Sequence, residues 1–263
     1  IADPARLFVA DFDLLARDER LISLDKKDRG FSEDEKQVLR SVELDILARV
    51  MPAYRAASER GQIEIATSPF YHPILPLLCD SDIHQVAIPG AARPQHRFQR
   101  PDDARLQIER WIALHEARFG SRPAGMWPSE GSVSDESVAL IAAAGLTWIA
   151  TDEDILSRSL NSPMRPELLY RRYRIGANGP VAVFRDHAMS DRIGFHYQSW
   201  DANAAAADFV NGVRDAGRRF TEGGGGEVAT VSVILDGENA WEYYDAGGRP
   251  FLRALYGALA AAT

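Results

Sequence analysis

The sequence has a single cysteine, Cys79, among its 263 residues. One cysteine cannot form a disulfide within the chain, so the fold does not depend on an oxidising compartment. No signal peptide is visible at the start of the sequence, and we therefore expect a cytoplasmic protein. No apolar run approaches the roughly 20 residues that a membrane-spanning helix needs, and we expect no membrane partner.

Basic residues are outnumbered, since 30 Lys and Arg stand against 38 Asp and Glu, for a formal net charge of -8. A nucleic-acid partner would require clustered Lys and Arg, so this class of function is excluded. No Gly-rich phosphate loop follows a predicted strand, because the run Gly223 to Gly226 precedes one and contains no Lys. We expect no cofactor.

The histidines lack the spacing of a metal site. A zinc deacetylase on a related barrel would place two histidines on one turn of a helix and add an aspartate. None of the six histidines has such a neighbour; they stand at positions 72, 84, 96, 115, 187 and 196. The sequence therefore predicts no catalytic metal.

Helical and extended segments alternate along the chain. Ser32 and Glu35 form a capping box that predicts a helix over residues 31–60, with Val38, Val42, Ile46 and Val50 on one buried stripe. Further helices are predicted for residues 102–119 and 134–144. Short apolar segments predict strands at residues 63–67, 124–127, 147–150, 180–184 and 228–235. Such alternation favours parallel βα units, in a barrel or in an open doubly wound sheet.

Acidic and aromatic residues gather where these strands end. Trp127-Pro128-Ser129-Glu130 follows one strand, Arg185-Asp186-His187 another, and Asp236-Gly237-Glu238 leads on to Trp241 after a third. Glu64 lies on the strand that precedes Phe70-Tyr71-His72. In βα barrels the working residues sit at strand ends, and carboxylates beside flat rings suit a sugar site.

Two of these acids meet the requirement of a retaining glycosidase. Such an enzyme uses an ionised carboxylate as nucleophile and a protonated carboxyl as acid, about 5–5.5 Å apart. Glu130 and Asp236 are far apart in sequence and follow different strands, which allows them to face each other across one cleft. The pattern alone leaves a second interpretation open, because acids at strand ends also cap the following helices.

At these motifs the sequence resembles glycoside hydrolase family 57. Trp127-Pro128-Ser129-Glu130 is similar to the family segment that carries the nucleophilic Glu, and Leu235-Asp236-Gly237-Glu238 to the segment with the acid/base Asp. Gly61-Gln62-Ile63-Glu64-Ile65 resembles a third motif. The segment from Thr67 to Leu78 looks like the α-amylase and amylopullulanase branch. The three motifs occur in family order over residues 30 to 260.

The resemblance implies that Glu130 is the nucleophile and Asp236 the general acid/base of a retaining enzyme that acts on α-1,4- or α-1,6-linked glucans. It also implies that Glu64 and Glu238 contact the substrate. The full set of candidate substrate-binding residues is Glu64, His72, Trp127, Arg185, His187, Glu238 and Trp241. The implied partner is an α-glucan or maltooligosaccharide, and no cofactor or metal is implied.

The family fold implies a partial (β/α)7 barrel. The family's opening His-Gln-Pro motif is absent, since His84-Gln85 is followed by Val86, and five strands are predicted instead of seven. We expect residues 1–263 to form one catalytic domain that belongs to a longer chain. Two alternatives remain at this point: a transglycosylase or branching enzyme, and a catalytically idle glucan-binding or scaffold domain.

Overall fold

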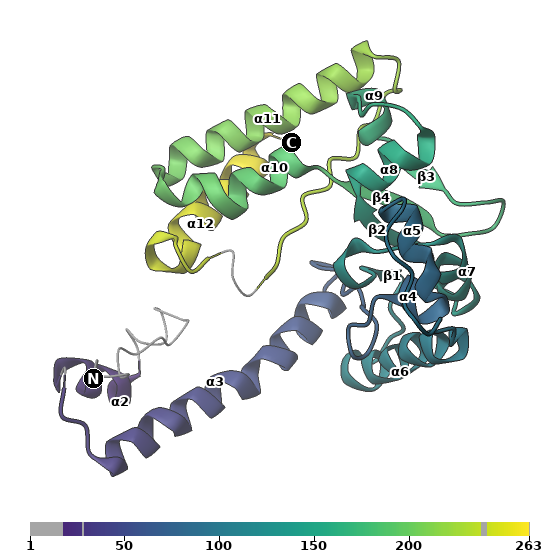
Figure 1. Ribbon diagram of the computed structural model, residues 1–263. Helices are drawn as coiled ribbons and strands as arrows, with labels where there is room; N and C mark the ends of the chain where they lie inside the picture. Colours follow the sequence, from purple (N-terminus) through teal and green to yellow (C-terminus); the bar gives the residue numbers. More distant parts are fainter. Residues whose placement is uncertain (1–17, 28, 238–240, 263) are drawn as a thin grey trace. The chain divides into compact units, whose positions relative to one another are not determined.

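A computed structural model describes residues 18–27, 29–237 and 241–262, and its Cα trace separates into two compact units (Figure 1). The first, which we call the helical unit, comprises the described part of residues 1–63, 194–207 and 236–263. The second, the sheet unit, comprises residues 64–193 and 208–235. None of the described helices has both the length and the hydropathy that crossing a membrane requires.

The helical unit contains α2 (Glu19–Lys27), α3 (Glu33–Glu59), the start of α11 (Ala202–Glu222) and α12 (Arg249–Ala262). The capping box predicted at Ser32 and Glu35 is present at the start of α3. The predicted buried stripe is confirmed for Val42, which is 2% exposed, and in part for Ile46, which packs against it, but Val38 and Val50 are 36% and 41% exposed. The reason is that α2 is short, so its buried Leu21 covers one turn of α3 around Val42.

The sheet unit is built on four strands in the order β1-β2-β4-β3. These are β1 (Gly125–Met126), β2 (Trp148–Asp152), β3 (Tyr173–Arg174) and β4 (Val181–Arg185). β1, β2 and β4 are parallel, and β3 pairs antiparallel with β4. Single parallel bridges, Thr67 to Met126 and Arg185 to Ser232, extend the parallel order on both sides. The predicted strands at residues 63–67 and 228–235 are thus reduced to one bridge each.

Helices connect the successive parallel segments of the sheet, as βα units require, starting with the bridge at Thr67. α4 (Leu75–Cys79), α5 (His84–Ala87) and α6 (Pro101–Phe119) precede β1, and α7 (Asp135–Ala143) lies between β1 and β2. α8 (Glu153–Leu160) and α9 (Pro166–Leu169) follow β2, and α10 (His187–Asp191) follows β4. The helices predicted at residues 102–119 and 134–144 are confirmed as α6 and α7.

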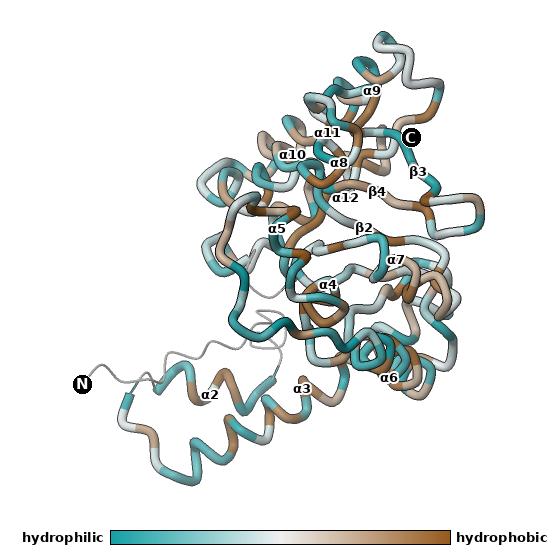
Figure 2. Tube along the Cα trace, turned by 45° about the vertical axis from the view of Figure 1, so that its right-hand side comes forward, coloured by the Kyte–Doolittle hydropathy of each residue, from teal (hydrophilic) through white to brown (hydrophobic). Residues whose placement is uncertain are grey.

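The two faces of the sheet differ. Ile149, Ala182 and Phe184 alternate onto one face and belong to one core cluster with buried residues of α4, α6, α7, α8 and α11. Apolar stretches of the chain at β2 and α4 are coloured brown in Figure 2. Burial of these apolar side chains, at about 25 cal/mol per Å² of apolar surface, is the main force that holds helices and sheet together. Trp148, Asp152 and Arg185 alternate with them and are half-buried on the opposite face.

Candidate active site

The turn after β1 carries Glu130 in an unusual backbone conformation. Glu130 has φ 56° and ψ 22°, and Gly131 follows with φ 66°, so two successive residues are left-handed. For a residue with a Cβ this conformation costs about 1–2 kcal/mol. Gly131 avoids that cost, and a Cβ there would lie 3.0 Å from the Trp127 ring. The side chain of Glu130 is 72% exposed at the carboxyl end of the strand.

His72 contacts Glu130 from the neighbouring strand end. Its Nε2 lies 3.1 Å from Glu130 Oε1, across 58 residues of sequence. His72 is itself left-handed, with φ 54°. Its loop is tied to α6, where Gln107 Oε1 accepts a hydrogen bond of 2.9 Å from the Tyr71 backbone N–H.

Backbone strain is therefore concentrated in one side-chain contact. The described residues include four non-glycine residues with positive φ: His72, Glu130, Asn161 and Ala246. Asn161 is the C-cap of α8, a position that Asn adopts readily, and Ala246 lies in a short 3-10 turn. The other two touch each other. Strained residues persist only where their surroundings hold them, and they cluster at functional sites.

Trp127 borders the same turn. Its ring lies against Gly131, and its backbone is tied to the preceding strand end because Trp127 N–H donates to Thr67 O (2.8 Å) and Ser68 Oγ donates to Trp127 O (3.0 Å). The structure thus brings His72, Trp127 and Glu130 of the predicted set together at the carboxyl end of the sheet.

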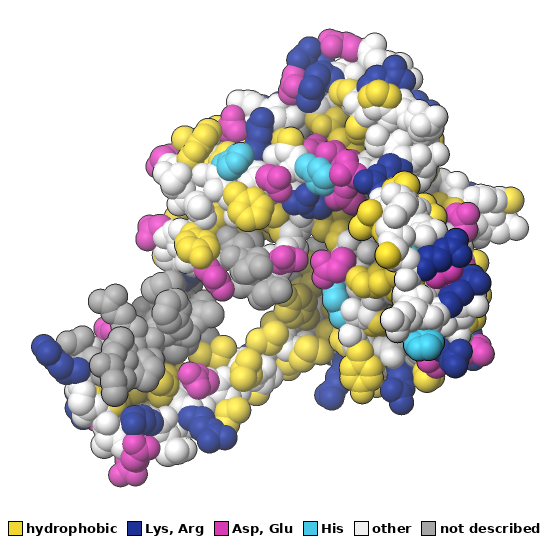
Figure 3. All heavy atoms as spheres, viewed as in Figure 1, with side chains coloured by type: hydrophobic (Ala, Val, Ile, Leu, Met, Phe, Trp, Pro, Cys, Tyr) yellow, Lys and Arg dark blue, Asp and Glu magenta, His cyan; other side chains and the backbone are white. Residues whose placement is uncertain are grey.

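The ends of β2 and β4 carry a second cluster, which sequence reasoning identified only in part. His187 Nε2 lies 2.6 Å from Asp152 Oδ2, and His187 Nδ1 lies 3.0 Å from Glu153 Oε1. Acidic and histidine side chains gather on this face near α8 and α10 (Figure 3). Sequence reasoning identified His187 of this cluster and missed Asp152. The rule of strand-end carboxylates applies equally to Asp152 and was the signal available.

The charges in this cluster are coupled. Burial by itself would lower the pKa of His187, but the hydrogen bond to Asp152 and the charges of Asp152 and Glu153 outweigh it and raise that pKa. Burial raises the pKa of the Glu153 carboxyl, against the opposing charge of His187. Ligand atoms of Asp152, Asp154 and His187 lie within 4.8 Å of one another. Both imidazole nitrogens face carboxylate oxygens, an arrangement that stabilises the protonated ring.

Arg185 holds the segment that leads to Asp236. Its Nε donates to Ile234 O (3.0 Å), and its Nη2 donates to Asp191 Oδ1 (2.7 Å). Ser190 Oγ accepts from the Ile234 backbone N–H at 3.1 Å. Asp236 follows two residues later and is exposed. A substrate contact for Arg185 stays a prediction. The hydrogen bonds of its guanidinium also give it a structural role, because they hold the backbone at Ile234.

Glu238 and Trp241 complete the predicted set. Glu238 lies outside the described residues. Trp241 is half-buried, and its ring packs against Tyr244 and Phe251, with centroid distances of 5.4 and 6.4 Å. The roles of Glu238 and Trp241, and the separation of the Glu130 and Asp236 carboxyls, stay predictions.

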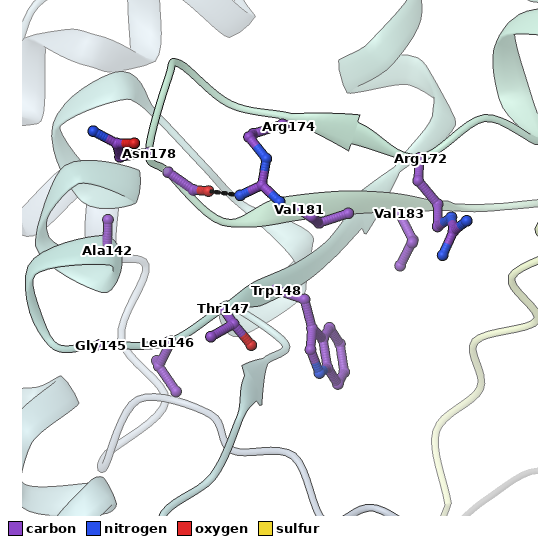
Figure 4. Close-up of a pocket in the computed structure, with 11 residues that line it drawn as sticks. Ala142, Gly145, Leu146, Thr147, Trp148, Arg172, Arg174, Asn178, Val181 and Val183 are labelled. Atoms are coloured by element: carbon purple, nitrogen blue, oxygen red, sulfur yellow. Dashed lines mark hydrogen bonds between the residues drawn. The ribbon is translucent and has the colours of Figure 1, made fainter.

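Glu64 lies at the other end of the sheet. Its Oε1 accepts a 2.6 Å hydrogen bond from the indole of Trp148, the first residue of β2. Asp152 ends the same strand four residues on, about 13 Å away at roughly 3.3 Å per residue. Beside Trp148 is an open hollow of about 660 Å³ whose lining includes Arg172 and Arg174 (Figure 4). The structure does not bring Glu64 together with His72 and Glu130.

Comparisons with known proteins bear on the family and the fold. The family model of glycosyl hydrolase family 57 matches residues 35–263. Alpha-amylase 1 of Dictyoglomus thermophilum is 31% identical over 128 residues, which are 48% of this chain and 15% of that protein. The chain therefore spans a small part of this curated relative.

Solved structures give the same fold. The α-amylase AmyC of Thermotoga maritima matches with a TM-score of 0.61 and 16% identity, covering 93% of this chain and 54% of its own. A family 57 branching enzyme of Thermococcus kodakaraensis, crystallised with glucose, matches with a TM-score of 0.63 and 16% identity, covering 93% and 55%. At this identity the likeness concerns the fold alone. It confirms the predicted α/β class and partial (β/α)7 barrel.

Proposed function

The chain belongs to glycosyl hydrolase family 57, and on that premise we propose that it cleaves or transfers α-glucosidic bonds with retention of configuration. In this proposal Glu130 is the nucleophile and Asp236 the general acid/base, and the substrate is an α-1,4- or α-1,6-linked glucan or maltooligosaccharide. The α-amylase and the branching enzyme that it resembles support both hydrolysis and transfer as outcomes.

The observation that supports this best is the contact between two strained residues, His72 and Glu130, at 3.1 Å. A neutral or charged imidazole Nε2–H donates to one carboxylate oxygen of Glu130 and fixes its orientation. The second oxygen stays available to attack. An exposed carboxylate on a strained turn at the carboxyl end of a parallel sheet is suited to reach a sugar bound above the strands.

The reaction then has two steps. Glu130 forms a bond to the anomeric carbon while the glycosidic C–O bond breaks and Asp236 gives its proton to the leaving oxygen. Asp236, now ionised, takes a proton from water or from an acceptor hydroxyl, whose oxygen attacks the anomeric carbon and releases Glu130. Water as acceptor gives hydrolysis, and a sugar as acceptor gives transfer.

Product analysis on amylose, pullulan and maltooligosaccharides tests the substrate class and separates hydrolysis from transfer. The assignment of Glu130 is tested with Glu130→Ala: hydrolysis should be lost, and azide should restore turnover of an activated α-glucosyl fluoride with inverted product. Substantial activity of Glu130→Ala without azide would remove Glu130 from the role of nucleophile. No turnover of any glucan by the unaltered chain would instead favour a glucan-binding domain.

The assignment of Asp236 is tested by leaving-group dependence. Asp236→Asn should slow amylose hydrolysis severely, because the alkoxide leaving group needs a proton, and should spare the first step on the fluoride, which needs none. The activity profile of the unaltered chain should be bell-shaped, with its alkaline limb reporting the pair of carboxyls. Equal losses on amylose and fluoride in the first step would show that Asp236 is not the acid.

A further inference from the structure

The turn that carries Glu130 is fixed from β2. Thr151, the residue before Asp152 on that strand, is 1% exposed, and its Oγ1 donates a 2.5 Å hydrogen bond to the carbonyl oxygen of Gly131. The bond joins residues 20 apart in the chain. Since Gly131 directly follows Glu130, its carbonyl defines one end of the left-handed pair.

Hydrogen bonds within the turn itself are less suited to fixing its position relative to the sheet. Backbone N–H groups of Gly131 and Ser132 donate to Pro128 O (2.8 Å) and Ser129 O (3.0 Å), and these bonds move with the turn. Ser129 is 1% exposed, and within the described part of the chain its Oγ has no hydrogen-bond partner. The side chain closest in sequence to Glu130 therefore does not brace it, whereas the hydroxyl from β2 does.

Thr151 is anchored independently of the turn. It pairs in register with Phe184 of β4 and stands in the middle of the parallel sheet, between Ala150 and Asp152. Its side chain is buried, and its hydroxyl is directed at the Gly131 carbonyl oxygen. A strand paired within the sheet thus holds the strained turn through one directed hydrogen bond. Such outside support is what a strained residue needs in order to persist.

We propose that Thr151 is a positioning residue for the Glu130 nucleophile, which it acts on through the Gly131 carbonyl. This inference rests on the proposed function of Glu130. It goes beyond it by naming a buried hydroxyl, away from the sugar, that sets the reach of the attacking carboxylate. A nucleophile displaced by a fraction of an ångström loses rate while substrate binding is kept.

The test compares three substitutions at Thr151 in the full chain. Thr151→Val has nearly the same shape without the hydroxyl, Thr151→Ser keeps the hydroxyl, and Thr151→Cys offers a weak donor of similar size. With an α-glucosyl fluoride we expect Thr151→Val to lower kcat about 10- to 100-fold with KM within about threefold, and Thr151→Ser to stay within about threefold of the unaltered chain. Thr151→Cys should fall between them, and it carries the test if the Val variant does not fold. A kcat of Thr151→Val within about threefold of the unaltered chain would overturn the proposal.

Thr147→Val is the matched control. Thr147 Oγ1 also donates to a backbone carbonyl, that of Ala124 at 3.0 Å, but it stands just before β2, at the amino end of the sheet. We expect its kcat to be unchanged. If Thr147→Val lowers kcat as much as Thr151→Val does, the effect is general loosening and the proposal fails.

Two readouts separate this proposal from the proposed function. In the Glu130→Ala background with azide, Thr151→Val should change the rescued rate less than about twofold, because no carboxylate remains to be positioned. An equal loss in both backgrounds would overturn the positioning role while leaving Glu130 as nucleophile. Hydrogen exchange of the Gly131 and Ser132 amides needs no activity, and it should speed up about tenfold in Thr151→Val and stay unchanged in Thr147→Val. Unchanged exchange in both would also overturn the proposal.

Discussion

The two ends of the parallel sheet hold the same kinds of side chain in different surroundings. At the carboxyl end, Glu130 and His72 contact each other through exposed side chains on strained backbone. At the amino end, Glu64 accepts from the Trp148 indole, and His115 is 4% exposed with its ring nitrogens 2.9 and 3.0 Å from the carbonyl oxygens of Ser121 and Ile65.

The difference separates a working contact from a structural one. His115 links two loops that each lead into a strand, and burial removes its access to any ligand. His72 links two strand ends, and more than half of its side chain stays open to solvent. Residue type alone therefore does not mark the site. The site is marked by exposed side chains on strained backbone at the carboxyl end of the sheet. Matched substitutions at the two ends test this distinction.

The largest effect is expected from the two glutamates. Glu130→Gln should lower kcat by about 10,000-fold or more, because an amide cannot serve as the nucleophile. Glu64→Gln should lower it by about tenfold or less, since a Gln oxygen still accepts from Trp148 and the residue lies at the opposite end of the strands. Steady-state kinetics of both variants checks this. Losses of similar size would show that the substrate site includes the amino end and would support Glu64 as a substrate contact.

Substitution of His72 should lower activity, whereas substitution of His115 should lower stability. His72→Ala removes a donor from the Glu130 carboxylate and should lower kcat on the order of 100-fold with little change in stability. His115→Ala leaves backbone carbonyls without a partner in the interior and should lower the free energy of unfolding by about 1–3 kcal/mol with kcat nearly unchanged. Urea unfolding and kinetics on both variants give the four numbers. A stable His115→Ala variant that has lost activity would contradict the division.

Local sequence signals predicted the elements with local causes. The capping box at Ser32 and the helices α6 and α7 follow from residues within a few positions of one another. The apolar run Val228 to Leu235 predicts a strand, yet only Ser232 pairs, because pairing depends on the partner strand and not on the run itself. β3 has two residues and no pattern to reveal it.

The site shows the same limit. Strand-end carboxylates could be located from the pattern, and Glu130 lies where predicted. The contacts of Glu130 with His72 and of Gly131 with Thr151 join residues 58 and 20 positions apart, and nothing local specifies them. His187 was predicted as a substrate contact, but its ring nitrogens face Asp152 and Glu153. That pairing depends on the register of β2 and β4, which places Asp152 beside Arg185.

The smallest effect is expected on the pH dependence of stability at the charged cluster around His187. This histidine lies at the carboxyl end of the sheet like His72, but carboxylates face both of its ring nitrogens. His187 is faced by Asp152 from β2, by Glu153 and Asp154 from α8, and by Arg185 from β4. Its pKa is raised, so the folded state binds the proton more tightly than the unfolded state does. The resulting stability is fully present below the ordinary pKa of about 6.5 and is lost as pH rises through the folded value.

The raised pKa of Glu153 acts in the same direction at lower pH, because the folded state again holds more protons than the unfolded state. Asp152→Asn should therefore lower the pKa of the His187 ring, followed by NMR, and flatten the fall in Tm as the pH rises above the ordinary value of about 6.5. Asp154→Asn is the matched control, since Asp154 belongs to the same helix start and Asp152, not Asp154, makes the 2.6 Å contact. If both variants shift the His187 titration equally, the pKa reflects the general acidity of the cluster rather than the Asp152 bond.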